Sequence, residues 1–168
     1  DTSDSDPNQF WSYVIAAFQS VHAEIGESVL SLLQLPQGLP AEAVPSILIN
    51  DVSTLNQDLT LILDDYHLIQ NDAIHTAMAF LLEHIPGNLH AVISTRVDPP
   101  WPLARFLFFF QLVEVRAKDL RFTSAEAASF LHQIMEMELS YDDVETLEER
   151  TEGWAAGLQL AALSMKGR

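Results

Sequence analysis

Two short, continuously apolar runs constrain the fold of this chain more than any other feature. Residues 59–63 read LTLIL, and residues 89–95 read LHAVIST. Runs of this length are too short for a buried helix and are typical of strands covered on both faces. Between them, residues 72–85 carry apolar side chains at helical spacing, and Pro86-Gly87 ends that pattern. Strand, helix and strand in this order predict a βαβ unit with two parallel strands.

Helical patterns precede this unit, and a further strand is predicted after it. Asp6-Pro7 reads as an N-cap followed by proline at the first helical position, and the apolar spacing carries that helix to about Gly26. Residues 29–35 form a shorter apolar stretch, and residues 41–55 predict an amphipathic helix with a proline in its first turn. Residues 111–115, QLVEV, alternate apolar and polar side chains and predict a third strand nearer an edge of the sheet.

From Asp119 onward the pattern is helical. Thr123 and Glu126 have the spacing of a capping box, and Ser140 with Asp143 is a second candidate. Residues 154–165 are apolar nearly all round, which predicts a largely buried helix.

The domain organisation follows from this change of pattern. We expect residues 1–118 to form an α/β part with a parallel sheet and residues 119–168 to form an all-α subdomain.

Charge and composition exclude several classes of function. Asp plus Glu number 24 against 8 Lys plus Arg, and the formal net charge is −16. Such a chain repels phosphate backbones and anionic lipid, so we expect it to bind neither nucleic acid nor a membrane surface by itself. It contains no cysteine, which removes disulfides and thiolate chemistry and suits a cytoplasmic location. Because the first residue is Asp1 rather than Met, we expect the sequence to be part of a longer protein.

The strongest chemical signal is a pair of acidic residues, Asp64 and Asp65, which directly follow the first predicted strand. In open α/β sheets, ligands bind outside the carboxyl ends of the strands. Two carboxylates there suit a site for magnesium and a nucleotide, in which one holds the metal and the next orients or deprotonates an attacking water. The alternative is that these residues only end the strand and cap the next element of the chain.

The second predicted strand ends in Ser94, Thr95 and Arg96. An arginine at this position could reach a terminal phosphate, since its planar fork matches phosphate oxygens. The alternative is a surface ion pair of Arg96 with Asp64, Asp65 or Asp98.

The sequence gives little support for a zinc site or for a serine hydrolase. The histidines lie in separate predicted elements without the spacing of a zinc site. His67 closely follows the acidic pair and could lie near a phosphate site, but it is interpreted as a polar loop residue. Ser94 lacks the context of a hydrolase nucleophile.

Residues 106–110 read FLFFF and allow two interpretations. In one, they form the buried end of a strand or helix. In the other, they lie exposed at a connection and form an apolar patch that supports self-association. The chain would then be a non-catalytic structural module that assembles through residues 106–110 or through the helices of residues 119–168.

Several stretches together resemble the nucleotide-binding region of MalT-like, LuxR-type transcription activators, which belong to the STAND branch of P-loop NTPases. They are DPNQFWSYVIAAFQ, IGESVLSLLQ, LTLILDDYHLI, HAVISTRVDPPWPLARF, LVEVRAKDLRFTSAEAASFL and ERTEGWAAGLQLAALSM. They cover nearly the entire chain. The resemblance implies part of a P-loop NTPase core in residues 1–118 and a helical lid in residues 119–168.

The resemblance also implies roles for individual residues. Asp64 would organise Mg²⁺, Asp65 would assist attack by water, and Thr95 with Arg96 would sense the nucleotide, ATP. In the lid, Gly157 and Gln159 would lie near the nucleotide. The intact regulator would switch to a self-associating state, sense a small-molecule or protein effector, and bind DNA, the last two through domains outside this chain.

Three departures limit what the resemblance implies. No GxxxxGK[ST] phosphate loop occurs in the chain. The family places that loop before the point where this sequence begins, so we expect weak or absent ATP binding here and ATPase activity only in the full-length protein. Gln159 stands where related proteins often carry proline. Residues 106–110 replace a basic, glycine-containing turn.

Overall fold

A computed structural model describes residues 5–33, 40–109 and 112–166 of the 168-residue chain. The chain divides into two compact units, Asp1–Leu112 and Val113–Arg168, hereafter the N-terminal and C-terminal units. Each unit has its own hydrophobic core. The sequence-based boundary lies slightly further along, after residue 118, and the identities given to the two parts remain predictions.

The N-terminal unit begins with three helices, α1 (Pro7–Gln19), α2 (Glu27–Leu33) and α3 (Ala43–Ser53). The predicted start of α1 is confirmed, since the Asp6 side chain accepts a hydrogen bond from the Gln9 N–H at 2.9 Å. The prediction that α1 continues to Gly26 is wrong. Gly26 has φ +69°, and a Cβ there would lie 3.0 Å from Ile15, so the chain leaves the helix to bring a glycine against α1.

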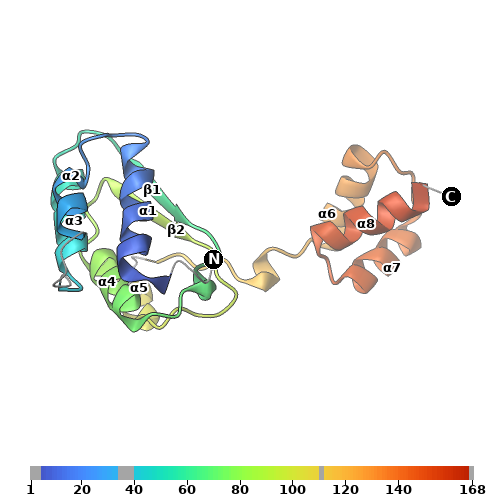
Figure 1. Cartoon of the computed structure of the whole chain (residues 1–168). Helices are drawn as coiled ribbons and strands as arrows, with labels where there is room; N and C mark the ends of the chain where they lie inside the picture. The colour runs from blue at the N-terminus through green and yellow to red at the C-terminus, as the bar shows by residue number, and fades with distance from the viewer. Residues whose placement is uncertain (1–4, 34–39, 110–111, 167–168) are drawn as a thin grey trace. The chain divides into compact units, whose positions relative to one another are not determined.

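The predicted βαβ unit is confirmed. β1 (Leu59–Leu63) and β2 (Leu89–Ile93) are parallel, with Leu59 opposite Leu89 and Leu63 opposite Ile93. The connection between them contains a short 3₁₀ helix, η2 (Tyr66–Leu68), and the helix α4 (Asp72–Glu83). Figure 1 shows α1 and α4 beside the two strands within this unit.

The prediction that both faces of the strands are covered is wrong. Leu59, Leu61 and Leu89 are buried in the core of the N-terminal unit. Ile62 and Val92 alternate with them along the strands and are 68% and 52% exposed. Successive side chains of a strand point to opposite faces. The helices of this unit supply a core on one face, and no described residue buries the other.

The third strand predicted at residues 111–115 is also absent from the described part of the chain. Residue 111 lies outside the described residues, and residues 112–116 adopt no regular structure. A strand needs a partner for its backbone hydrogen bonds, and the described sheet pairs only β1 with β2. Before this stretch lies the short helix α5 (Leu103–Phe108), and after it the 3₁₀ helix η3 (Ala117–Asp119).

After η3, the C-terminal unit contains α6 (Ser124–Ser129), the π-helix η4 (Phe130–Ile134), α7 (Tyr141–Thr151) and α8 (Ala155–Lys166). The predicted capping box of Thr123 and Glu126 is present at α6. Ser140 caps α7, since its hydroxyl accepts a hydrogen bond from the Asp143 N–H and donates to the Asp143 carboxylate. Within the described residues the Ser140 N–H makes no bond to that carboxylate, so the reciprocal half of the second predicted box is not formed.

The prediction that the last helix is largely buried is wrong. In α8, Leu158 and Ala162 lie in the core of this unit, whereas Leu160 is 69% exposed. α8 packs through one side against α7 and η4, and within this unit no described residue buries its opposite side.

The described chain is therefore a mixed α/β fold, mostly helical, with a small parallel sheet. None of the helices in the described residues combines the length and the apolar character that a membrane span requires.

Candidate functional site

The two acidic residues predicted as a site lie in a turn directly after β1. Both carboxylate side chains are exposed, and Asp65 adopts the left-handed backbone conformation with φ +51°. Asp and Asn tolerate this conformation better than most residues. Tyr66 comes next, with a buried side chain that anchors the turn. We call residues 64–66 the acidic turn.

Parallel pairing brings the end of β2 beside this turn. The N–H of Ser94 donates to the Leu63 carbonyl at 2.9 Å, and the N–H of Tyr66 donates to the Ser94 carbonyl at 2.9 Å. The Ser94 hydroxyl donates a hydrogen bond to Oδ1 of Asp64, and it accepts one from the Asp65 N–H at 3.1 Å. The two strand ends are thus joined by backbone and side-chain contacts through a single serine.

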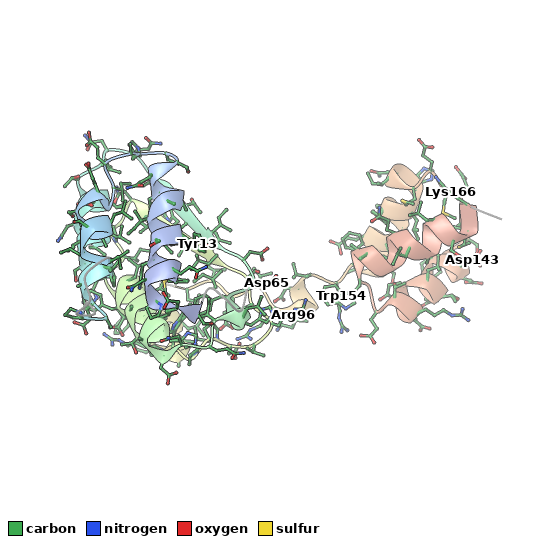
Figure 2. All side chains as sticks on the ribbon, in the orientation of Figure 1. Tyr13, Asp65, Arg96, Asp143, Trp154 and Lys166 are labelled. Carbon is green, nitrogen blue, oxygen red and sulfur yellow. The ribbon has the colours of Figure 1, made fainter. Side chains whose placement is uncertain are left out.

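Thr95 and Arg96 lie at the same edge. The hydroxyl of Thr95 donates to the Val97 carbonyl at 2.7 Å, which fixes its side chain in the turn after β2. Arg96 is exposed, and it lies at the same end of the N-terminal unit as Asp65 (Figure 2). Among the described residues, no ion pair joins Arg96 to Asp64 or Asp65. Four of the six predicted site residues therefore share one sheet edge.

A hollow of about 230 Å³ lies beside the acidic turn. It is lined by one side of α1, by β1 and by the turn itself, including Phe10, Tyr13, Asp64 and Asp65. The hollow is apolar along the helix and acidic at the end of the strand. A ligand with both a polar and an apolar part would find complementary surfaces there.

His67 directly follows the acidic turn and lies beside it. It belongs to η2 and is mostly buried, and its Nδ1 lies 3.8 Å from Oδ1 of Asp65. This nitrogen is buried and has no hydrogen-bond partner in the described part of the chain. The interpretation as an ordinary loop residue is therefore wrong.

A cluster of aromatic residues supports the acidic turn from behind. The ring of Tyr66 lies 4.7 Å from that of Trp101, and its hydroxyl is hydrogen-bonded to Nδ1 of His75 at 3.0 Å. The indole N–H of Trp101 donates to the His75 carbonyl at 3.2 Å. Burial raises the pKa of Tyr66 well above its usual value. These contacts connect the acidic turn to α4 and to the segment that comes after Arg96.

Ser94 and Tyr66 were not predicted from the sequence as parts of the site. Ser94 was considered only as a nucleophile, although its place at the end of the second strand put it opposite the acidic pair. The signal for Tyr66 is its place directly after two carboxylates. A large aromatic side chain there is either exposed or buried, and if it is buried it anchors the turn.

The donor set of this edge fits magnesium bound to a nucleotide. Among the described residues, no group of three or more His, Asp or Glu side chains could enclose a metal ion. Magnesium is usually held by one or two carboxylates together with waters and phosphate oxygens, rather than by a cage of protein ligands. The exposed carboxylates of Asp64 and Asp65 supply that kind of partial coordination.

The two remaining predicted residues belong to the C-terminal unit. Gly157 lies in α8, and a Cβ there would lie 3.0 Å from the Cβ of Thr151, so this glycine allows α7 and α8 to approach closely. Gln159 is exposed on α8. Their predicted place near a nucleotide stays a prediction.

The apolar residues 106–110 are divided between core and surface. Phe106 is buried, whereas Leu107, Phe108 and Phe109 are exposed, with Phe108 at 76%. The rings of Phe108 and Phe109 pack edge to face at 5.2 Å. Phe110 lies outside the described residues.

Comparison with known proteins finds the same kind of regulator in several bacteria. No protein-family model matches the chain. The chain is 40% identical over 168 residues to the HTH-type transcriptional regulator MalT of Serratia proteamaculans (strain 568). It is 36% identical over 166 residues to the MalT regulator of Yersinia enterocolitica, and 37% identical to that of Yersinia pestis (strain Pestoides F). Each alignment covers 99% of this chain and 18% of the relative.

The MalT-like part of the resemblance is thereby confirmed, whereas the assignment to a nucleotide-binding region of the STAND branch stays a prediction. The chain is a MalT-like segment, which over nearly its whole length matches one part, 18% of the length, of the HTH-type transcriptional regulators named MalT.

Proposed function

We propose that this segment is a nucleotide-binding region of a MalT-like transcriptional regulator, in which ATP and Mg²⁺ bind at the edge formed by the ends of β1 and β2. One observation carries the proposal. Two adjacent exposed carboxylates, Asp64 and Asp65, lie at the carboxyl end of a strand beside Thr95 and Arg96 at the end of its parallel neighbour. This is where ligands bind in open α/β sheets.

Each residue has a role that its chemistry supports. Asp64 would hold the metal, directly or through a water, and Asp65 would orient or deprotonate a water for attack on the terminal phosphate. The guanidinium of Arg96 contacts the phosphate oxygens and so senses the terminal phosphate. Magnesium bound at this edge neutralises phosphate charge. Thr95 holds the turn that carries Arg96, through its bond to Val97.

The contacts behind the site support a role as a switch. Tyr66 belongs to the acidic turn, and Trp101 belongs to the segment after Arg96, and the two rings pack together. A nucleotide bound at Asp65 and Arg96 therefore contacts both chain segments that the packed rings of Tyr66 and Trp101 join. We propose that ATP binding changes the conformation of the regulator in this way, with hydrolysis only in the full-length protein.

Partners of the regulator are part of the same proposal. The chain carries a net charge of −16, which disfavours contact with DNA. We therefore place DNA binding in a part of the regulator outside this segment, and the resemblance implies the same for recognition of an effector. Self-association follows ATP binding.

The proposal is tested by amide NMR of this chain with Mg²⁺-ATP in the millimolar range. Because no phosphate loop occurs in the sequence, we expect weak binding that nevertheless shifts the amide signals of residues 64–66 and 94–97. Asp64→Ala abolishes these shifts. The matched control is Asp58→Ala, which removes an exposed carboxylate just before β1, at the opposite end of the strand. Shifts confined to other surfaces, or equal loss in both variants, contradict the proposal.

A second candidate function is self-association without a nucleotide. It is favoured by the exposed aromatic residues Phe108 and Phe109 at the end of α5, since exposed apolar groups of this size are typical of interfaces. Light scattering over a range of concentrations tests it. A mass that rises with concentration, and falls to the monomer value in Phe108→Ser/Phe109→Ser but not in Tyr141→Ser, supports this function. A strict monomer excludes it.

A further inference from the structure

Ser94 contacts both acidic residues of the candidate site and the residues on either side of them, although no role has yet been given to it. Its N–H and carbonyl group bond to Leu63 and Tyr66, on the two sides of the acidic pair. Its hydroxyl donates to the Asp64 carboxylate and accepts from the Asp65 N–H. Ser94 therefore determines how both acidic residues are presented.

The contacts distinguish the two oxygens of the Asp64 carboxylate. Oδ1 accepts hydrogen bonds from the Ser94 hydroxyl and from the Asp65 N–H, the latter at 3.0 Å. Oδ2 accepts no hydrogen bond from any described residue, and the side chain of Asp64 is exposed. One oxygen is thus used within the protein, and the other is free to bind a cation.

This asymmetry matters because magnesium and calcium use carboxylates differently. Mg²⁺ requires near-ideal octahedral geometry and takes single oxygens, whereas Ca²⁺ accepts six to eight oxygens and often binds both oxygens of one carboxylate. A carboxylate with Oδ1 already committed cannot chelate without losing two hydrogen bonds. It remains a good ligand for a cation that needs one oxygen.

We propose that Ser94 is a positioning residue that makes the site selective for Mg²⁺ over Ca²⁺, by holding Asp64 as a ligand through a single oxygen. This inference rests on the proposed metal site at Asp64. It adds that discrimination between the two cations comes from a serine that itself touches no metal.

The experiment compares the two cations on the whole chain. MgCl₂ and CaCl₂ are titrated separately, and the Asp65 amide signal reports binding, because this N–H donates to both Asp64 and Ser94. The wild-type chain binds Mg²⁺ more tightly than Ca²⁺. In Ser94→Ala the ratio of the two dissociation constants moves toward Ca²⁺ by about tenfold, because Mg²⁺ affinity falls by at least the roughly tenfold that follows loss of a group orienting a metal ligand, while Ca²⁺ gains the second carboxylate oxygen. Ser94→Thr, which keeps the hydroxyl, retains the wild-type ratio.

Two further variants separate selectivity from folding. Ser53→Ala removes an exposed serine hydroxyl that bonds only within α3, and it leaves the ratio unchanged. If Ser94→Ala does not fold, Ser94→Cys replaces it, because a thiol is a weak hydrogen-bonding group, and the same shift of the ratio is expected.

The outcomes separate the inference from the proposal on which it rests. If the wild-type chain shows no change at Asp65 with either cation, the proposed metal site fails and the inference with it. If the wild-type chain binds Mg²⁺ and the ratio is the same without the Ser94 hydroxyl, the metal site stands and the role of Ser94 is wrong.

Discussion

The hydroxyl of Tyr66 and Nδ1 of His75 are hydrogen-bonded at 3.0 Å, and this contact joins the acidic turn to the helix that connects the two strands. Tyr66 is nearly fully buried, so its phenol is kept in the neutral form, and burial raises its pKa. Any condition that ionises this phenol therefore acts on the turn that carries Asp64 and Asp65.

Tyr66 should make the N-terminal unit less stable at alkaline pH. The unfolded chain releases the phenol proton near pH 10, whereas the folded chain retains it. The contribution of Tyr66 to the free energy of unfolding is present in full below about pH 10. Above that pH it is lost, and the free energy of unfolding falls by about 1.4 kcal/mol per pH unit. Urea denaturation from about pH 8 to about pH 11.5, a range that brackets the ordinary tyrosine pKa, measures this slope. Tyr66→Phe should remove it, and Tyr141→Phe, at an exposed position, should not. A slope that survives in Tyr66→Phe would show that another group is responsible.

Glu126 should titrate at lower pH than an ordinary glutamate. The backbone N–H of Thr123 and then its hydroxyl donate to the carboxylate, at 2.8 Å and 2.9 Å, and hold its pKa below the usual value. Its contribution to stability is present above the ordinary pKa and is lost as the pH falls through the lowered one. Carboxyl ¹³C NMR follows the titration. Thr123→Ala should raise the pKa part of the way, whereas Ser124→Ala should leave it unchanged. Equal shifts in both variants would count against the capping box as the cause.

Gly153→Ala should destabilise the C-terminal unit. Gly153 has φ +70°, and a Cβ there would lie 2.6 Å from the carbonyl oxygen of Phe122. The backbone conformation alone costs about 1–2 kcal/mol for a residue with a Cβ, and the contact adds to this. Gly87→Ala is the control, because a Cβ there meets nothing within 4 Å, and it should change stability by less than about 1 kcal/mol. Urea denaturation followed by amide signals of each unit measures both. Similar effects of the two substitutions would rule out this explanation.

Two leucines in α8 should differ sharply when truncated. Leu158 is fully buried, and Leu160 is largely exposed. Leu158→Ala should cost about 2–5 kcal/mol of unfolding free energy, because it leaves a cavity. Leu160→Ala should change it by no more than about 0.5 kcal/mol. Thermal and urea denaturation of the C-terminal unit provide the measurement. A large loss in Leu160→Ala would mean that the outer side of α8 is covered in solution.

Local signals in the sequence predicted the elements that carry the site. The runs at β1 and β2, with the helical spacing between them, were sufficient for the βαβ unit. The N-cap at Asp6 and the box at Thr123 were recognisable because capping depends on residues three positions apart. The position of Asp64 and Asp65 at a strand end came from the same local pattern.

The features that the sequence could not predict depended on residues distant along the chain. Ile62 and Leu61 look alike in an apolar run, and only the position of the helices decides that one is exposed and the other buried. Residues 111–115 alternate apolar and polar side chains, as an edge strand does. A strand forms only where a neighbouring strand accepts its backbone hydrogen bonds, and the alternation does not reveal whether one is present. The contact between Ser94 and Asp64 depends on strand register and on the orientation of one hydroxyl, and neither is visible in composition or spacing.

The exposed side of the sheet has a consequence for the solubility of the chain. Ile62 and Val92 present an uncovered β surface, which is the kind of surface that leads to aggregation. At neutral pH the net charge of −16 keeps copies of the chain apart. That repulsion disappears near the isoelectric point of about 4.4. Colloidal stability of this segment therefore depends on its carboxylates, and precipitation in mild acid should begin at the sheet before either core unfolds.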